Sequence, residues 1–293
     1  MDAKIWQVMQ SAIRSVTRSA PRPSRRPHYS DSLILRMYLW AVWHDRPMKW
    51  ACSRDHNNSF YRPRALPSPS QFSRRLRTPR FRELLRALHE RLAASNEPQR
   101  LAFLDGKPLP VSNASRDPDA RVGWCTTGFA KGYRLHACVT NDRRIKSFCV
   151  TGMNDGEARI AREQLEIDPS VSIVMADANY DAGETYAKLS EAGHQLLTPL
   201  KRIATGRTAW DRMHPARRIV ARMQLRSESQ HRANLEPRKR IENVFSVLTC
   251  FGGGLAPLPA WVRTIKRVQR WVAAKISIYH ARLRVMESEG KHA

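Results

Sequence analysis

The first third of the chain carries its apolar residues at helical spacing. Leu33, Met37, Trp40 and Trp43 recur at steps of three and four residues within residues 32–51. Such steps place the side chains on one side of a helix, so the pattern predicts an amphipathic helix here.

Two further helix starts follow. Ser68, Pro69 and Gln71 have the order of a capping box with proline in the first turn. Thr78 and Pro79 predict a second start, and leucines and a phenylalanine at helical spacing follow it. We therefore expect two consecutive small helices in this region.

The first of these two helices is expected to expose Arg74, Arg75 and Arg77. Small helices with an arginine face are typical of helix-turn-helix modules, which makes the three residues candidates for DNA contacts. An ordinary helical domain with a solvated charged face explains the same pattern. The sequence leaves both interpretations open.

The centre of the chain changes to short apolar runs separated by turns. Residues 100–111, 132–140 and 145–153 predict three successive strands, with Asn141 and Asp142 as the turn between the last two. A helix, a strand, a second helix and a fifth strand follow, at residues 154–166, 172–181, 183–193 and 195–200. The order β-β-β-α-β-α-β predicts an RNase H-like α/β fold, in which helices pack on a mixed sheet.

This pattern predicts two domains. Residues 1–98 are expected to form a helical N-terminal region, and residues 99–293 are expected to form the RNase H-like domain. Within the second domain, residues 201–235 are a basic segment expected as a long loop or a partly helical excursion. Helices are expected to close the chain.

The distribution of charge along the chain indicates what kind of partner it binds. The 293 residues contain 51 Lys and Arg against 26 Asp and Glu, a net charge of +25. Residues 1–100 and 201–293 carry +13 and +14, whereas residues 101–200 carry −2. Neutralised phosphates supply most nucleic-acid affinity, so the flanks predict contacts to nucleic acid and the centre predicts a function that needs carboxylates. A generally basic protein, such as a ribosomal factor, is the alternative.

Cysteines and apolar runs indicate the compartment. The five cysteines include no C-x-x-C pair and indicate free thiols in a reducing environment. The most apolar run, residues 33–43, contains Arg36 and is too short for a bilayer, and the N-terminus lacks the apolar stretch of a signal peptide. We expect a cytoplasmic protein with no membrane partner, associated with the nucleoid when bound to DNA.

Two aspartates stand where apolar strands end, Asp105 in AFLDGK and Asp177 in VMADAN. A charge there is costly unless it is paired or metal-bound, and two such carboxylates on neighbouring strands suit Mg²⁺ or Mn²⁺. A strand-end cap explains either residue alone. Glu242, in a helix with an apolar side, is the candidate third carboxylate, and Glu236 is its nearest rival. Arg238 lies one helical turn before Glu242, so a plain surface ion pair is the alternative.

These segments carry a family resemblance. LDGKPLPV, GYRLHACVT, VTGMNDGEARIAREQL, IVMADANYDAGETYAKL and RKRIENVFSVL together resemble the DDE-type transposases of bacterial insertion sequences, over roughly residues 30–285. The resemblance implies an RNase H-like fold with catalytic, metal-binding Asp105, Asp177 and Glu242. It also implies that the helical N-terminal region, residues 1–98, serves DNA binding or dimerisation. It also implies two Mg²⁺ (or Mn²⁺) ions per site, used for DNA cleavage and strand transfer.

The resemblance further implies partners and surrounding residues. Double-stranded DNA, as terminal inverted repeats and as target, is the expected substrate, bound by a homodimer. The expected DNA contacts near the metals are Arg134, Arg238, Lys239 and Arg240. His136, Tyr180 and Asp181 are expected to support the site or face DNA, although alternation along any half-buried strand also explains His136.

Two other functions fit the same sequence. An RNase H-like nuclease or resolvase uses similar carboxylates but does not join DNA. A domesticated, non-catalytic DNA-binding protein is the candidate from a different class. A strand-transfer assay distinguishes the transposase from the nuclease or resolvase, and the presence of all three carboxylates argues against the non-catalytic protein.

Overall fold

A computed structural model describes residues 2–23, 27–56, 65–95, 97–125, 128–203, 206–250, 255 and 258–290. The chain forms two compact units. The first contains residues 1–94 and 248–293, and the second contains residues 95–247. The sequence predicts a division after residue 98 with the closing helices in the second domain, whereas this grouping places the closing helix with the N-terminal helices.

The first unit is built from helices. They are α1 (Ala3–Ser19), α2 (Asp31–Trp43), α3 (Pro69–Leu76), α4 (Pro79–Ala93) and α11 (Ile265–Ser288), with short 3₁₀ turns at Trp50–Cys52 and Arg54–His56. The predicted capping box is present, because Ser68 accepts from the Gln71 backbone and the Gln71 side chain accepts from the Ser68 backbone. Contacts of α11 with α1, α2 and α4 form the core of this unit.

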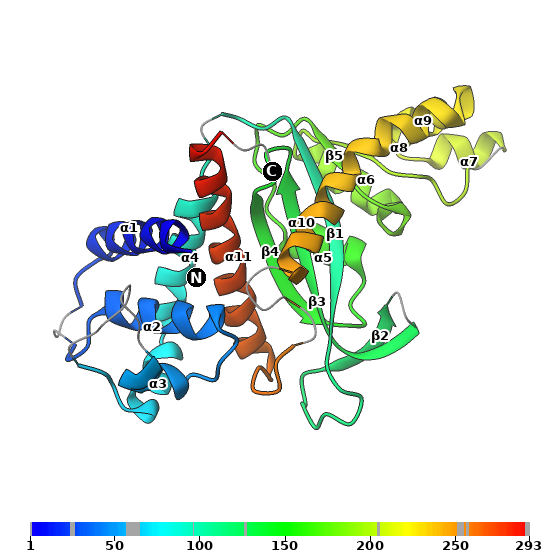
Figure 1. The fold of residues 1–293 in the computed structure, drawn as a ribbon. Coiled ribbons are helices and arrows are strands. Elements are labelled where there is room, and N and C mark those ends of the chain that lie inside the picture. Colours follow the sequence, from blue (N-terminus) through cyan, green and yellow to red (C-terminus); the bar gives the residue numbers. More distant parts are fainter. Residues whose placement is uncertain are drawn as a thin grey trace. The chain divides into compact units, whose positions relative to one another are not determined.

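The second unit is organised around a mixed six-stranded sheet (Figure 1). Its strands are β1 (Leu101–Pro110), β2 (Arg121–Cys125), β3 (Gly128–Thr140), β4 (Ile145–Gly152), β5 (Ile173–Met175) and β6 (Gln195–Leu197). β3 pairs antiparallel with β1, β2 and β4, whereas β5 pairs parallel with β1 and β6. The predicted mixed α/β, RNase H-like fold is confirmed.

Helices complete the second unit. They are α5 (Glu157–Gln164), α6 (Gly183–Glu191), α7 (Arg207–Arg212), α8 (Pro215–Arg226), α9 (Glu228–Leu235) and α10 (Lys239–Cys250), whose last residues pass the unit boundary. Short 3₁₀ turns occur at η3 (Ala178–Tyr180) and η4 (Glu236–Arg238). The basic segment expected as a long loop or partly helical excursion is thus mostly helix.

Strand β2 was not among the predicted strands. It forms a hairpin with the first residues of β3, which begins four residues before the predicted strand 132–140. The first two residues of β2 are both exposed, so exposed and buried side chains do not alternate along the whole strand. Its extended conformation depends on pairing with β3.

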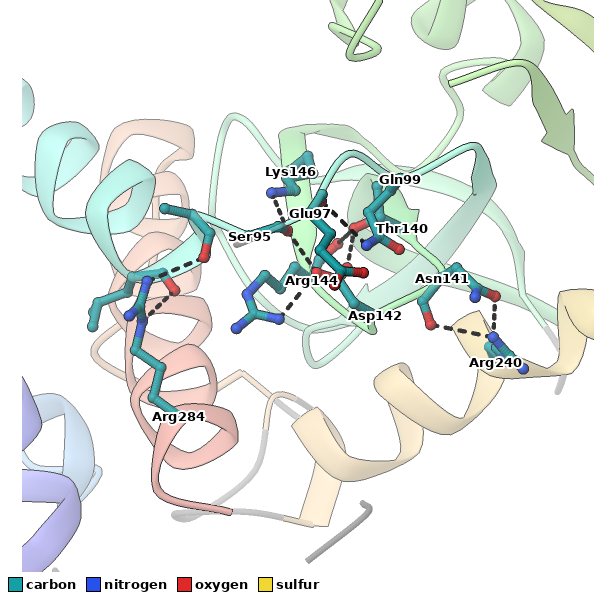
Figure 2. A network of polar contacts seen from close by, with 12 residues as sticks. Ser95, Glu97, Gln99, Thr140, Asn141, Asp142, Arg144, Lys146, Arg240 and Arg284 are labelled. Carbon is teal, nitrogen blue, oxygen red and sulfur yellow. Dashed lines mark hydrogen bonds and ion pairs between the residues drawn. The ribbon is translucent and has the colours of Figure 1, made fainter. Parts of the chain in front are cut away.

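A polar network fixes the turn between β3 and β4 (Figure 2). Asp142 accepts hydrogen bonds from Ser95 and Thr140, both at 2.6 Å, and forms an ion pair with Arg144 at 3.0 Å. Lys146 donates to Ser95 at 2.7 Å. The predicted Asn141–Asp142 turn is therefore present and is held by charged hydrogen bonds.

No helix in the described segments combines the length and the apolar content needed to cross a bilayer.

Candidate active site

Three carboxylates gather beside the parallel pair β1 and β5. Asp105 lies on β1, Asp177 follows β5, and Glu157 is the first residue of α5. One oxygen from each lies within 4.8 Å of the other two. Phe103 on β1 pairs with Met175 on β5, and Asp105 and Asp177 each follow two residues later. Because the two strands are parallel, this register brings the two aspartates together.

Gly106 allows the close approach of Asp105 and Glu157. Its backbone N–H donates to Asp105 Oδ1 at 2.8 Å. A Cβ at position 106 would lie 2.5 Å from Glu157 Oε1, which is closer than a real Cβ contact. The glycine that follows the first aspartate therefore has a steric role at this site.

Glu157 is 9% exposed and is held by one arginine. Arg134, on β3, donates from Nη1 to Glu157 Oε1 at 2.6 Å and from Nη2 to the carbonyl oxygen of Trp124 at 2.5 Å. The two bonds of one planar guanidinium fix the orientation of the carboxylate relative to the β2–β3 hairpin.

Asp177 is oriented by the turn that it begins. Its Oδ1 accepts from the backbone N–H of Asn179 at 2.8 Å, as the N-cap of η3. The Asn179 side-chain amide donates to Asp177 Oδ2 at 3.2 Å. Burial raises the pKa of Glu157, and a hydrogen bond from the Asn179 side chain acts against this rise, so Asn179 stabilises two carboxylates of the group.

The carboxylates of Asp105, Asp177 and Glu157 repel one another, and burial reduces their solvation. Burial, and then the charges of Asp177 and Glu157, raise the pKa of Asp105 to about 7, although the Gly106 backbone and Arg238 act in the opposite direction. Burial also raises the pKa of Glu157 despite its Arg134 partner. A group of hard oxygen donors with excess negative charge is what Mg²⁺ or Mn²⁺ binds, so the donor set fits a divalent metal.

Tyr180 lies fully buried next to this group. Its hydroxyl has no hydrogen-bond partner among the described residues. Burial raises the pKa of Tyr180 strongly, and the charges of Glu157, Asp105 and Asp177 raise it further. The phenol stays protonated and supplies a neutral donor beside the carboxylates.

Glu242 lies on α10, outside this close group, with its side chain 51% exposed. Arg238 donates from Nη2 to Glu242 Oε1 at 2.6 Å, and its Nη1 lies 3.9 Å from Asp105 Oδ2. A single guanidinium thus contacts both Asp105 and Glu242. The rival Glu236 forms an exposed ion pair with Lys239 at 2.7 Å.

The candidate DNA contacts on α3 differ in their surroundings. Arg74 and Arg77 are exposed in the first unit. Arg75 forms an ion pair with Asp31, which also accepts from Arg80 Nε at 2.7 Å. Arg75 therefore holds α2 and α3 together. The exposed side chains of Arg74 and Arg77 are more accessible to a phosphate than Arg75 is.

The remaining candidates lie in the second unit. Arg240 donates to Asn141 in the β3–β4 turn (Figure 2), and Lys239 pairs with Glu236. His136 is buried and contacts Thr151 Oγ1 at 2.9 Å, and burial lowers its pKa to about 4. This imidazole is therefore neutral at physiological pH.

Asp181 is also tied to the surrounding structure. It accepts two hydrogen bonds from Arg217, at 2.7 and 2.8 Å, and one from the Lys201 backbone at 2.9 Å. The two hydrogen bonds from the Arg217 guanidinium join the segment after Asp177 to α8. Asp181 thus supports the loop that carries the second aspartate.

Sequence reasoning did not single out Glu157 or Asn179. An acidic residue in the first turn of a helix is common, because it interacts favourably with the helix dipole. Nothing in the local sequence distinguishes Glu157 from such a residue. Only the pairing of β1 with β5 and the position of α5 reveal its neighbours.

Comparisons with known proteins give one family match. No curated protein matches the sequence. The profile of the family described as the transposase DDE domain matches residues 96–268, which is more than half of the chain. The matched segment includes the whole sheet and Asp105, Glu157, Asp177 and Glu242. The chain therefore belongs to the transposase DDE domain family.

Proposed function

We propose that this protein is a transposase that cuts DNA at the ends of an insertion sequence and joins the ends to target DNA. The observation that carries the proposal is the gathering of Asp105, Asp177 and Glu157 within 4.8 Å in a chain of the DDE family. Double-stranded DNA, as terminal inverted repeats and as target, is the proposed substrate. We propose a homodimer on nucleoid DNA as the working form.

Asp105, Asp177 and Glu242 are the proposed catalytic carboxylates. Asp105 and Asp177 are adjacent, and Arg238 contacts both Asp105 and Glu242, which supports Glu242 as the third member. Only 8% of the Glu157 side chain is exposed and Arg134 holds it, whereas 51% of the Glu242 side chain is exposed, so we assign Glu157 to positioning and to the negative charge of the site.

Divalent metal, as two Mg²⁺ or Mn²⁺ ions per site, would be held by these carboxylates and would supply Lewis acidity and an activated water. The chain's own residues do the rest. Asp177 is kept in one orientation by Asn179, and Asp105 by Gly106. Arg238, Lys239 and Arg240, with Arg134, are the proposed phosphate contacts beside the site.

Substitution of Asp177 by Asn tests this proposal. The change keeps the shape of the side chain but removes a charge, so cleavage and strand transfer in Mg²⁺ are expected to fall by orders of magnitude. DNA binding is expected to persist, because most of the positive charge lies outside residues 101–200. Gel assays of cleavage, joining and binding measure the three effects separately.

Asp119→Asn is the matched control, because Asp119 lies in the loop between β1 and β2. It is expected to leave cleavage and joining near the wild-type rates. A D177N protein that still joined DNA would place the metal site elsewhere. Cleavage by the wild type without joining would indicate a nuclease or resolvase, and binding without cleavage in any divalent metal would indicate a non-catalytic DNA-binding protein.

A further inference from the structure

An exposed aromatic patch lies on the hairpin formed by β2 and the start of β3. Val122, Trp124 and Phe129 are 60%, 63% and 73% exposed. The Trp124 and Phe129 rings contact each other edge to face, with centroids 5.3 Å apart. Large apolar side chains are costly to leave in water together, so such a patch calls for a functional explanation.

Strand register places these side chains on one face of the hairpin. Trp124 pairs with Phe129 and Val122 pairs with Lys131, and directly opposed residues in an antiparallel pair point to the same side. The intervening Gly123 points to the other side. A Cβ on Gly123 would lie 2.5 Å from the carbonyl oxygen of Met153. The backbone at Met153 covers that side of the hairpin. The side that carries Val122, Trp124 and Phe129 is the one open to a partner.

The hairpin is also connected to the acidic group. Arg134 joins the carbonyl oxygen of Trp124 to the carboxylate of Glu157 by its two hydrogen bonds. Glu157 is in turn within 4.8 Å of Asp105 and Asp177. The backbone that carries the exposed indole is therefore positioned by one arginine relative to the carboxylates.

We infer that Trp124 and Phe129 form a stacking platform for an unpaired DNA base next to the position of the cut. This inference rests on the proposed function and names a contact of the same site. Aromatic faces bind unstacked bases of any sequence, and an exposed cation on the same strand, Arg121, is available to the adjoining phosphate. The net charge of +25 attracts a polyanion.

A second protein fits this patch less well. Stable protein interfaces bury roughly 800 Å² on each partner, whereas this patch consists of three side chains. Charge and size together favour DNA as the occupant.

The test uses the full-length protein and two DNA probes. The first is fluorescein-labelled oligo(dT), measured by anisotropy, and the second is a forked duplex with 2-aminopurine at the first unpaired position. Trp124→Ala is expected to weaken oligo(dT) binding about tenfold, as loss of one stacking contact does, and to relieve the quenching of 2-aminopurine. Trp124→Phe is expected to restore most of both signals.

The contact between Arg134 and residue 124 uses the backbone carbonyl, so Trp124→Ala leaves that hydrogen bond in place. Phe129→Ala is a second variant with the same expected direction. Leu225→Ala is the matched control, because Leu225 on α8 is 61% exposed and away from the hairpin in the sequence. It is expected to bind both probes like the wild type. Circular dichroism checks that each variant is folded.

Two outcomes overturn the inference. Wild-type affinity and quenching in both Trp124→Ala and Phe129→Ala mean that the patch does not stack bases. A change in sedimentation without a change in DNA binding means that the patch joins copies of the chain. Either result leaves the proposed function intact if Asp177→Asn still abolishes cutting, whereas cutting by D177N overturns the proposed function independently of the patch.

Discussion

Gly106 controls the distance between two carboxylates through the atom that it lacks. Its backbone N–H holds Asp105 while its missing side chain makes room for Glu157. The pKa of Asp105, raised to about 7 by burial first and then by Asp177 and Glu157, shows the electrostatic cost of this arrangement. A divalent cation would offset that cost by favouring the charged carboxylates.

Gly106→Ala is expected to slow DNA cleavage strongly and to lower stability moderately. The new methyl group displaces the Glu157 carboxylate, and a misplacement of about 1 Å at a catalytic site costs up to about 100-fold in rate. The carboxylate that must move is buried and bound by Arg134, so the unfolding free energy is expected to fall by about 1–3 kcal/mol. Single-turnover cleavage and thermal unfolding measure the two effects.

Gly183→Ala is the control for this substitution. A Cβ on Gly183, the first residue of α6, meets nothing within 4 Å. Cleavage by this variant is expected to match the wild type. If Gly106→Ala also cut DNA at the wild-type rate, the position of Glu157 would not matter for catalysis.

The two aspartates and the glutamates differ in how far sequence could locate them. Asp105 and Asp177 are predictable because a charged residue directly after a run of apolar residues is unusual. Glu242 rests on family resemblance, and its link to Asp105 through Arg238 depends on where α10 packs. Glu157 could not be found, since its role arises from a contact between α5, β1 and β3.

Secondary-structure elements whose signals are local were predictable. The capping box at Ser68 and the start at Thr78 involve residues only three positions apart, and both helices begin as expected. The β2–β3 hairpin was missed because β2 has five residues and depends on its partner strand. In the same way, the helices within residues 207–235 carry many charged and polar side chains, which blurs their apolar spacing.

The β3–β4 turn offers a test of how a polar network stabilises an element. Burial alone would raise the pKa of Asp142, but hydrogen bonds from Ser95 and Thr140, and the charges of Arg144 and Lys146, together lower it. A carboxylate with a lowered folded-state pKa stabilises the fold above its unfolded pKa of about 3.9. This stabilisation is lost as the pH falls through the folded-state value.

Asp142→Asn is therefore expected to lower the Tm by about 3 °C at pH 7, since charged hydrogen bonds contribute about 1–2 kcal/mol. The difference from the wild type is expected to shrink below about pH 4, where the wild-type carboxyl becomes protonated. Thermal unfolding followed by circular dichroism at several pH values measures both effects.

Asp211→Asn, which changes an exposed carboxylate on α7, is the matched control and is expected to change the Tm by less than about 1 °C. A difference between D142N and the wild type that stayed constant from pH 7 to pH 3 would show that Asp142 acts through shape rather than charge.

At the scale of the whole molecule, the two ends of the chain form one unit. Residues 1–94 and 248–293 pack together, and the long helix α11 has its buried side chains against α1, α2 and α4. Arg284, on α11, donates to carbonyl oxygens at the end of α4 (Figure 2). Deletion of the N-terminal helices would expose the apolar side of α11, so substitutions in the full chain are the appropriate test of their role.

The last prediction concerns how this unit binds DNA. Arg74 and Arg77 on and after α3 are exposed, and we expect each to neutralise one phosphate. The slope of log affinity against log salt is about −0.9 for each phosphate contact in duplex DNA. The double substitution of both residues by Ala is therefore expected to make the slope shallower by ~1.8 and to weaken binding at low salt. Filter binding of duplex DNA from 50 to about 300 mM salt measures it.

The control for this experiment removes the same charge elsewhere. Arg86 and Arg232 are each paired with a glutamate one turn away on their own helix. Because these guanidiniums already have partners, their replacement by Ala is expected to change the salt slope much less. An equal loss of slope in both double variants would mean that net charge alone attracts DNA. A slope unchanged by the Arg74 and Arg77 substitutions would mean that α3 does not contact phosphates and that the arginines of the second unit hold the DNA.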